Sequence, residues 1–198
     1  MENLKISDFG GAVLAGGFSK RMGFDKALLE LDGKPLITRV TDSLLEAGLV
    51  APQIVGGEIE SFRKLGYSCL EDEYPGEGPL GGIITALNYF KALEKSHVFV
   101  VACDLPNISA SFINQMCKES LKEKESVIVA MANGYLQWMH TLWPTTILET
   151  LIEAFKNGER AAWRAIKDVP LIKIDSANPD HLLDIDRPED LEKFLNEI

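Results

Sequence analysis

Short apolar runs alternate along the chain with longer stretches in which apolar residues recur every three or four positions. The short runs are continuously apolar, which is typical of strands buried on both faces of a parallel sheet. They predict buried strands at residues 11–14, 53–55, 98–102 and 127–130. The segment 134–144 has the least regular pattern and is assigned to neither a helix nor a strand.

The longer stretches predict amphipathic helices, because apolar residues three and four positions apart share one face of a helix. These helices are predicted at residues 37–47, 80–93, 110–121 and 146–155. A last helix is expected after Asp186, since Pro188 suits a first helical turn and Glu189 is the acid three residues after the cap. The alternation predicts an α/β fold with a mostly parallel central sheet flanked by helices on both faces.

The 198 residues predict a single domain spanning 1–198, since domains average roughly 150 residues and no repeat, linker or low-complexity tract divides the chain. Hydrophobic residues make up 46% of the chain and charged residues 25%, and both values are ordinary for a globular protein. The composition therefore argues against disorder.

The charge balance limits the classes of partner. The chain carries 20 Lys and Arg against 30 Asp and Glu, a net charge of −10, which repels nucleic acid phosphates and anionic lipid headgroups. Neither nucleic acid nor a membrane is expected as a partner. Three cysteines without metal-ligand spacing, no apolar signal segment and no run of roughly 20 apolar residues lead us to expect a cytoplasmic protein.

The first predicted strand leads into a loop, residues 14–26, that reads LAGGFSKRMGFDK. Residues 18–26 carry three basic side chains and one acidic one, a local charge of +2 in an acidic chain. A positive loop at the carboxyl end of a parallel strand suits an anionic ligand, and glycines let backbone N–H groups approach phosphate oxygens. The loop predicts a phosphate site; the alternative is a tight turn with solvated basic residues. No Gly-Lys-Ser/Thr follows the glycines, which excludes a Walker A loop.

A second glycine-rich segment, residues 76–81, reads GEGPLG and matches the dinucleotide-binding pattern of dehydrogenases. The context does not fit, because such a loop begins directly at the end of a strand, whereas residues 71–75 intervene here. We interpret the segment as a second loop that faces the same crevice and leads into a helix with Pro79 in its first turn.

Asp104 follows the apolar run 98–102 and is expected at the end of a central strand, facing the crevice. Mg²⁺ typically takes one or two protein carboxylates together with phosphates and waters, so Asp104 is the candidate metal ligand. The alternative is that Asp104 caps the next helix, but Ser109 is better placed for that role. Cys103 is interpreted as a small buried hydrophobic residue and not as a nucleophile.

Five motifs fall in register over nearly the full length of the chain. They are LAGG-x-S-x-RMG-x-DKALL at 14–29, GKPL at 33–36, PG-x-GPLGG at 75–82, CDLP at 103–106 and DID-x-PEDL at 184–191. Together they resemble the molybdenum cofactor guanylyltransferases. The first motif also occurs in other nucleotidyltransferases, so the alternatives are a cytidylyltransferase of the same cofactor or a sugar-phosphate nucleotidyltransferase. A nucleotide-binding regulator without turnover is a third possibility, against which the presence of Arg21, Lys26 and Asp104 counts.

The resemblance implies a Rossmann-like nucleotidyltransferase fold and a Mg²⁺-dependent enzyme that joins GMP from GTP to molybdopterin, releasing pyrophosphate. It implies that Asp104 binds the metal, that Lys26 contacts the phosphates and that Asp72 contacts the nucleoside; the alternative for Asp72 is one of three neighbouring solvated acids. Arg21, Lys26 and Asp104 are the predicted catalytic residues, with the two cations offsetting phosphate charge. The predicted nucleotide contacts are Leu14, Ala15, Gly16, Gly17, Lys26, Asp72, Gly78, Pro79, Leu80 and Asp104. Besides GTP and molybdopterin, cofactor-delivery or molybdoenzyme chaperone proteins are the expected partners.

Two positions depart from the family pattern. The family often has an asparagine after the second strand, where Gly56 and Gly57 stand here, and a His-Pro pair near a later strand, where Gln137 and Trp138 stand. The residues that would contact the pterin therefore stay open. The candidates, with core packing, a dimer contact or plain exposure as the alternatives, are Tyr135, Trp138, His140, Trp143, Arg160 and Arg164.

Overall fold

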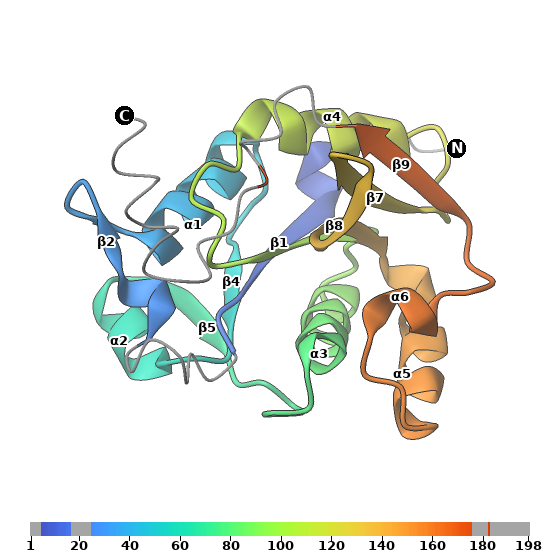
Figure 1. Cartoon of the computed structure of the whole chain (residues 1–198), viewed down its shortest axis with the longest axis horizontal. Helices are drawn as coiled ribbons and strands as arrows, with labels where there is room; N and C mark the ends of the chain where they lie inside the picture. Colours follow the sequence, from blue (N-terminus) through green and yellow to red (C-terminus); the bar gives the residue numbers. More distant parts are fainter. Residues whose placement is uncertain (1–4, 17–24, 176–181, 183–198) are drawn as a thin grey trace.

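A seven-stranded sheet forms the centre of the computed structural model, which describes residues 5–16, 25–175 and 182 (Figure 1). Its strands are β1 (Phe9–Leu14), β4 (Gln53–Val55), β5 (Ser68–Leu70), β6 (His97–Ala102), β7 (Val127–Ala132), β8 (Tyr135–Pro144) and β9 (Leu171–Asp175). They lie in the order β5-β4-β1-β6-β8-β7-β9, and every neighbouring pair is parallel except the two that involve β8. The short strands β2 (Glu30–Leu31) and β3 (Lys34–Pro35) form a separate antiparallel ribbon.

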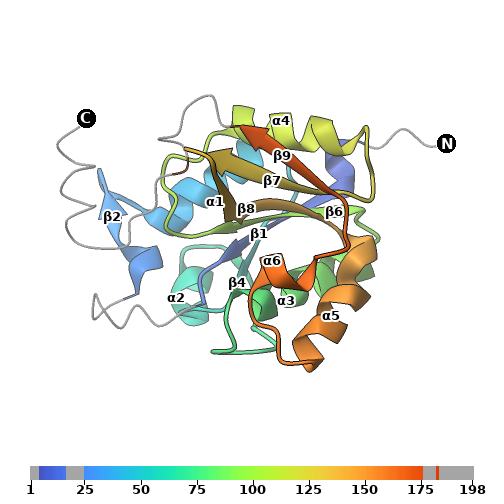
Figure 2. The ribbon, with the colours of Figure 1, turned by 45° about the vertical axis from the view of Figure 1, so that its right-hand side comes forward.

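Helices cover both faces of this sheet. They are α1 (Leu36–Glu46), α2 (Ile59–Lys64), α3 (Pro79–Ala92), α4 (Ala110–Ser120), α5 (Leu148–Lys156) and α6 (Ala162–Ala165), with the 3-10 turns η1 (Ile6–Asp8), η2 (Lys26–Leu28) and η3 (Thr145–Ile147). Figure 2 shows α1 and α4 on one side of the sheet and α3, α5 and α6 on the other. The predicted α/β architecture is confirmed.

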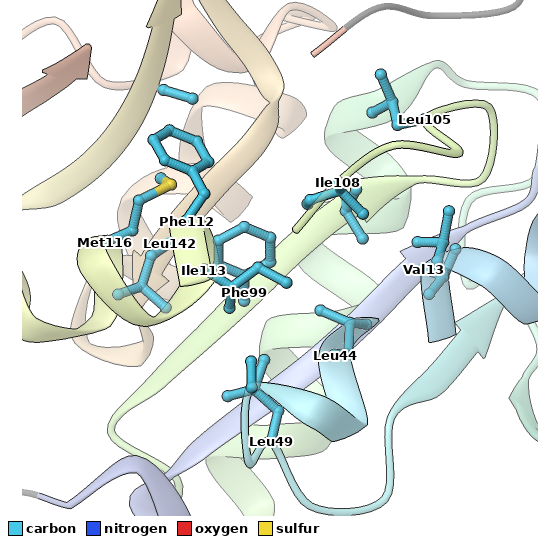
Figure 3. Packing of buried hydrophobic residues seen from close by; sticks show 14 of the residues in the cluster. Val13, Leu44, Leu49, Phe99, Leu105, Ile108, Phe112, Ile113, Met116 and Leu142 are labelled. Atoms are coloured by element: carbon cyan, nitrogen blue, oxygen red, sulfur yellow. The ribbon is translucent and has the colours of Figure 1, made fainter. Parts of the chain in front are cut away.

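Each face of the sheet has its own apolar core, because alternate residues of a strand point to opposite faces. On the face covered by α1 and α4, Val13 and Phe99 pack with Leu44 of α1 and with Ile113 and Met116 of α4 (Figure 3). The other face packs residues of β1 and β6 against α3, α5 and α6. Burial on both faces explains why β1 and β6 read as continuous apolar runs.

The four predicted strands and four predicted helices are all present, with ends that shift by one or two residues. The helix predicted at 146–155 corresponds to η3 and α5 together. As predicted, Ser109 caps α4, because its hydroxyl accepts a hydrogen bond from the Phe112 N–H. The final helix predicted after Asp186 lies outside the described residues. No helix in the described part of the chain is long and apolar enough to cross a membrane.

The sequence pattern missed the strands β2, β3, β5, β8 and β9 and the helices α2 and α6. The most consequential miss is β8, which covers almost all of the segment predicted to be irregular. Val129 of β7 pairs with Thr141, but the next residue, Ala130, pairs with Gln137, so residues 138–140 have no partner in β7. This bulge interrupts the period of two, which is the signal that would have revealed the strand.

His140 lies in this bulged part of β8 and is 1% exposed. Its pKa is lowered from 6.5 to about 3 by burial, which disfavours the charged imidazolium. Between these two values the unfolded chain binds a proton that the folded chain does not bind. The stability associated with neutral His140 is therefore complete above pH 6.5 and is lost as the pH falls.

We predict that substitution His140→Gln flattens the acid limb of the stability profile. Below pH 6.5 the titration of His140 should lower the wild-type free energy of unfolding by about 1 kcal/mol per pH unit. The variant should lack this contribution. Urea denaturation at pH 7.5 and pH 5 measures both slopes. Equal losses in the two proteins would show that His140 is already protonated or hydrated in the folded state.

Candidate active site

The carboxyl ends of four parallel strands meet at one edge of the sheet, which we call the carboxyl edge. Leu14 at the end of β1 pairs with Val55 of β4 on one side and with Ala102 of β6 on the other, and Val55 pairs with Leu70 of β5. After β1 the chain adds β4 and β5 on one side and then crosses to β6 on the other. Ligands of open α/β sheets bind at such a reversal of strand order.

Backbone hydrogen bonds continue past the strand ends and fix the loops that leave the carboxyl edge. The Ala15 N–H donates to the Val55 carbonyl over 3.0 Å, and the Cys103 N–H donates to the Leu14 carbonyl over 3.1 Å. The Gly56 N–H donates to the Leu70 carbonyl over 3.0 Å. Ala15 and Gly16 are therefore held between the loops that carry Gly56 and Asp104.

Lys26 and Asp104, both predicted site residues, meet in an ion pair at this edge. The Lys26 Nζ lies 2.9 Å from the Asp104 Oδ2, and the two side chains are 10% and 22% exposed. Partial burial strengthens such a pair, because less water screens the charges. The arrangement places one cationic and one anionic group side by side, where phosphate oxygens and a metal ion would need them.

Asp25 is the residue that holds Lys26 at this position, and the sequence reasoning did not assign it a role. Its Oδ1 accepts a hydrogen bond of 2.9 Å from the Ala27 N–H and so caps the η2 turn that carries Lys26. Its Oδ2 accepts a bond of 3.3 Å from the Glu58 N–H, in the loop after β4. Asp25 thereby ties the η2 turn to a second loop of the carboxyl edge.

Asp72 faces the first glycine loop, as its predicted contact with a nucleotide requires. Its Oδ1 accepts a bond of 3.0 Å from the Tyr74 N–H and lies 3.2 Å from the Thr85 Oγ1. Its Oδ2 lies 3.7 Å from the position that a Cβ at Gly16 would occupy. The structure thus places the Asp72 carboxylate beside Gly16, with the Tyr74 N–H and the Thr85 hydroxyl as its neighbours.

The second glycine loop leads into α3 beside the first, as predicted. Gly78 precedes the helix with φ of 87°, a conformation that favours glycine, and Pro79 is its first residue. A Cβ at Gly82 would lie 3.2 Å from the Leu14 Cδ2, so the first turns of α3 rest on the end of β1. Leu80 was predicted to contact the nucleotide, but the whole residue is 0% exposed, so neither its side chain nor its backbone presents surface to a ligand.

Gly56 and Gly57 show why the loop after β4 carries no asparagine side chain toward the site. Both have φ of +72°, and a Cβ at Gly57 would lie 2.9 Å from the Ala15 carbonyl oxygen. A Cβ at Gly56 would lie 3.2 Å from the Gly16 Cα. The two glycines let the loop after β4 pack against the first glycine loop. In the sequence, the signal that could have predicted this contact is the pair of consecutive glycines after the strand.

Several residues considered from the sequence are buried in the core or exposed on the surface. Burial raises the pKa of the Cys103 thiol, so Cys103 is a neutral core residue as predicted. His140 and Trp143 are buried, whereas Tyr135 is 75% exposed. Gly17, a predicted nucleotide contact, and Arg21, predicted to offset phosphate charge, lie outside the described residues.

A hollow of about 270 Å³ lies between β5 and α3. Its lining includes Thr85, whose hydroxyl neighbours Asp72, but none of the predicted nucleotide contacts. The chemistry is therefore assigned to the carboxyl edge and not to this hollow.

The strand order, the two glycine loops and the Lys26–Asp104 pair define a nucleotidyltransferase, and comparison with known proteins agrees. Residues 11–174 match the family described as the MobA-like NTP transferase domain. A Thermococcus sibiricus protein named "Probable molybdenum cofactor guanylyltransferase" is 33% identical over 93% of this chain and 96% of its own. A Vibrio parahaemolyticus protein named "Molybdenum cofactor guanylyltransferase" is 29% identical over 92% of each chain.

A solved structure shares the fold. The crystal structure of molybdopterin-guanine dinucleotide biosynthesis protein A from Archaeoglobus fulgidus superposes with a TM-score of 0.78 at 21% identity, covering 95% of this chain and 97% of the other. The chain belongs to the MobA-like NTP transferase family and, within it, groups with the molybdenum cofactor guanylyltransferases.

We predict that Gly57→Ala destabilises the protein more than the matched change Gly66→Ala. Both glycines have positive φ, but a Cβ at Gly66 would meet nothing within 4 Å. Gly66→Ala should cost about 1 kcal/mol through backbone strain alone, and Gly57→Ala about 3 kcal/mol because the methyl group also meets Ala15. Urea denaturation of both variants compares the two costs, and equal losses would contradict the close approach of these loops.

Proposed function

We propose that this protein transfers GMP from GTP to molybdopterin and releases pyrophosphate, with Mg²⁺ as its metal. The observation that carries the proposal is the Lys26–Asp104 pair beside two glycine loops at the carboxyl edge of β1 and β6. The names of the family relatives support the substrates, because a molybdenum cofactor guanylyltransferase acts on a guanine nucleotide and on the cofactor. The family match over residues 11–174 supports a single domain spanning 1–198.

The residues present fit a divalent metal that arrives with the nucleotide. The described residues contain no group of three or more His, Cys, Asp or Glu that could hold a metal ion without further ligands. Mg²⁺ needs no such group, because it keeps several waters and binds through one or two carboxylates plus substrate phosphates. Asp104, partly exposed at its strand end, would hold the Mg²⁺, which when bound neutralises charge on the phosphates.

The transfer needs positioning and charge neutralisation more than proton transfer. A phosphate oxygen of molybdopterin attacks the α-phosphorus of GTP and forms a new P–O bond, while the bond from that phosphorus to the β-phosphate oxygen breaks. The attacking phosphate is already anionic at neutral pH, so no general base is required. The burial of His97, Cys103 and His140 is consistent with this, since none of them is placed to take a proton from a substrate.

Each remaining site residue has a role in this proposal. Lys26 and Arg21 contact the phosphates, and the Lys26 ammonium also donates to Asp104. Asp72 contacts the nucleoside. The two glycine loops contact the nucleotide mainly through backbone groups at Leu14, Ala15, Gly16, Gly17, Gly78 and Pro79.

Backbone contacts can select guanine. Its N1 and N2 donors suit backbone carbonyl acceptors, whereas a smaller pyrimidine would leave buried carbonyls unpaired, at about 1 to 3 kcal/mol for each. We predict that pyrophosphate release with molybdopterin and Mg²⁺ is at least about ten times faster with GTP than with CTP. Single-turnover assays with each nucleotide at subsaturating concentration measure the ratio.

One control and two contrary outcomes complete this assay. Omitting molybdopterin should abolish pyrophosphate release, which separates transfer from nucleotide hydrolysis. A preference for CTP would replace the guanylyltransferase proposal with the cytidylyltransferase alternative. Release with a sugar 1-phosphate and none with molybdopterin would reject both.

A further inference from the structure

Arg160, in the segment between α5 and α6, is joined to the second glycine loop by an ion pair. Its Nε donates to the Glu77 Oε2 over 2.6 Å, and its Nη1 donates to the carbonyls of Phe155 and Glu159 over 3.0 and 2.9 Å. The guanidinium carbon lies 4.0 Å from the centroid of the Phe155 ring. The guanidinium is therefore fixed by stacking and by three hydrogen bonds, and it is directed at Glu77.

The same loop is held from a second direction through Tyr74. The Tyr74 ring packs on the Phe155 ring, with centroids 4.5 Å apart, and the Tyr74 carbonyl accepts a bond of 3.1 Å from the Glu77 N–H. The Tyr74 N–H in turn donates to Asp72. Contacts thus run without a break from Arg160 through Glu77 and Tyr74 to the carboxylate proposed to meet the nucleoside.

The loop needs such support because its own residues restrain it weakly. Gly76 and Gly78 have φ of +79° and +87°, and a Cβ at Gly76 would meet nothing within 4 Å. Gly78 supplies no side chain to cap α3. Glycine loses the most backbone freedom on ordering, so a ligand that orders a free glycine loop binds less tightly than one that meets a loop already held.

The exposure of the pair indicates that folding does not depend on it. The Arg160 and Glu77 side chains are 42% and 51% exposed, and ion pairs with such exposure contribute little to the free energy of unfolding. Arginine suits the position better than lysine, because its planar head stacks on Phe155 while donating in fixed directions.

We propose that Arg160 is a positioning residue that acts through Glu77 to hold the second glycine loop in its nucleotide-binding conformation. This inference rests on the proposed function, in which that loop contacts GTP. The Arg160 guanidinium donates its hydrogen bonds to Glu77 and to the backbone carbonyls of Phe155 and Glu159. We therefore assign Arg160 to positioning the loop and not to direct contact with the pterin phosphate.

The test compares Arg160→Gln, Glu77→Gln and the double variant by calorimetry with GTP and Mg²⁺. Each single variant should weaken GTP binding by about 3-fold, within the range of an exposed ion pair, and the double variant no further, because each substitution removes the same ion pair. The KM for GTP should rise while kcat at saturating substrates stays within about 2-fold. Lys91→Gln is the matched control, because Lys91 and Glu149 form an exposed pair between α3 and α5 away from the loop, and it should leave GTP binding unchanged.

Three results would overturn the inference. The first is wild-type affinity for GTP in both single variants. The second is a rise in KM for molybdopterin in Arg160→Gln that Glu77→Gln does not reproduce, since this would place Arg160 on the substrate. The third is additive losses in the double variant.

Amide hydrogen exchange over residues 76–82, measured without nucleotide, separates this inference from the proposed function. Faster exchange in both single variants supports the restraint of the loop even if the wild-type protein binds no GTP, a result that would reject the proposed function alone. Unchanged exchange overturns the inference even if GTP binding is demonstrated.

Discussion

The parallel pairing of β1 with β6 is the constraint on which the site depends. Residues 26 and 104 are 78 positions apart, and their side chains meet because the two strands run side by side and end at the same level. The backbone bond from Cys103 to Leu14 extends this register into the loops.

The second requirement is the close approach of three loops at the carboxyl edge. Gly57 in the loop after β4 lies against Ala15, and Gly82 at the start of α3 lies against Leu14, both at distances that a larger residue would disturb. Side chains then fix the backbone that the glycines leave free. Asp25 holds the η2 turn to the loop after β4, and Asp72 holds Tyr74 before the second glycine loop.

Much of this architecture could be predicted from the sequence because strands buried on both faces leave an unambiguous pattern. The runs that became β1 and β6 are continuously apolar, and the residue that follows a parallel strand faces the ligand side of the sheet. Asp104 could therefore be predicted as a site residue from the sequence alone, although its pairing with Lys26 could not. The relation to nucleotidyltransferases was predicted from sequence motifs, and the role of Asp72 was predicted only from that family resemblance.

The remainder depends on contacts between distant segments. β8 was not predicted because the bulge that leaves residues 138–140 without partners in β7 interrupts the alternation of apolar and polar residues. β5 was not predicted because three residues are too few to show such an alternation. The pairing of Lys26 with Asp104 and of Arg160 with Glu77 follows from which strands and helices are neighbours, a property that local patterns do not encode. The sequence shows that residue 57 is a glycine. That this position requires a glycine becomes clear only from its positive φ and its close approach to Ala15 in the structure.

The central claim is that Lys26 and Asp104 form a site for the phosphates of a nucleotide and not a structural ion pair. Calorimetry of Lys26→Ala with GTP, GDP and guanosine in the presence of Mg²⁺ tests it most directly. Lys122→Ala, which removes a lysine paired with Glu119 on the surface, is the control and should behave as wild type. Lys26→Ala should weaken GTP binding by at least about 10-fold, the size of a charge-assisted contact, and leave guanosine binding unchanged. Equal losses for all three ligands would contradict the claim, because they would show that Lys26 maintains the fold of the site without contacting phosphate.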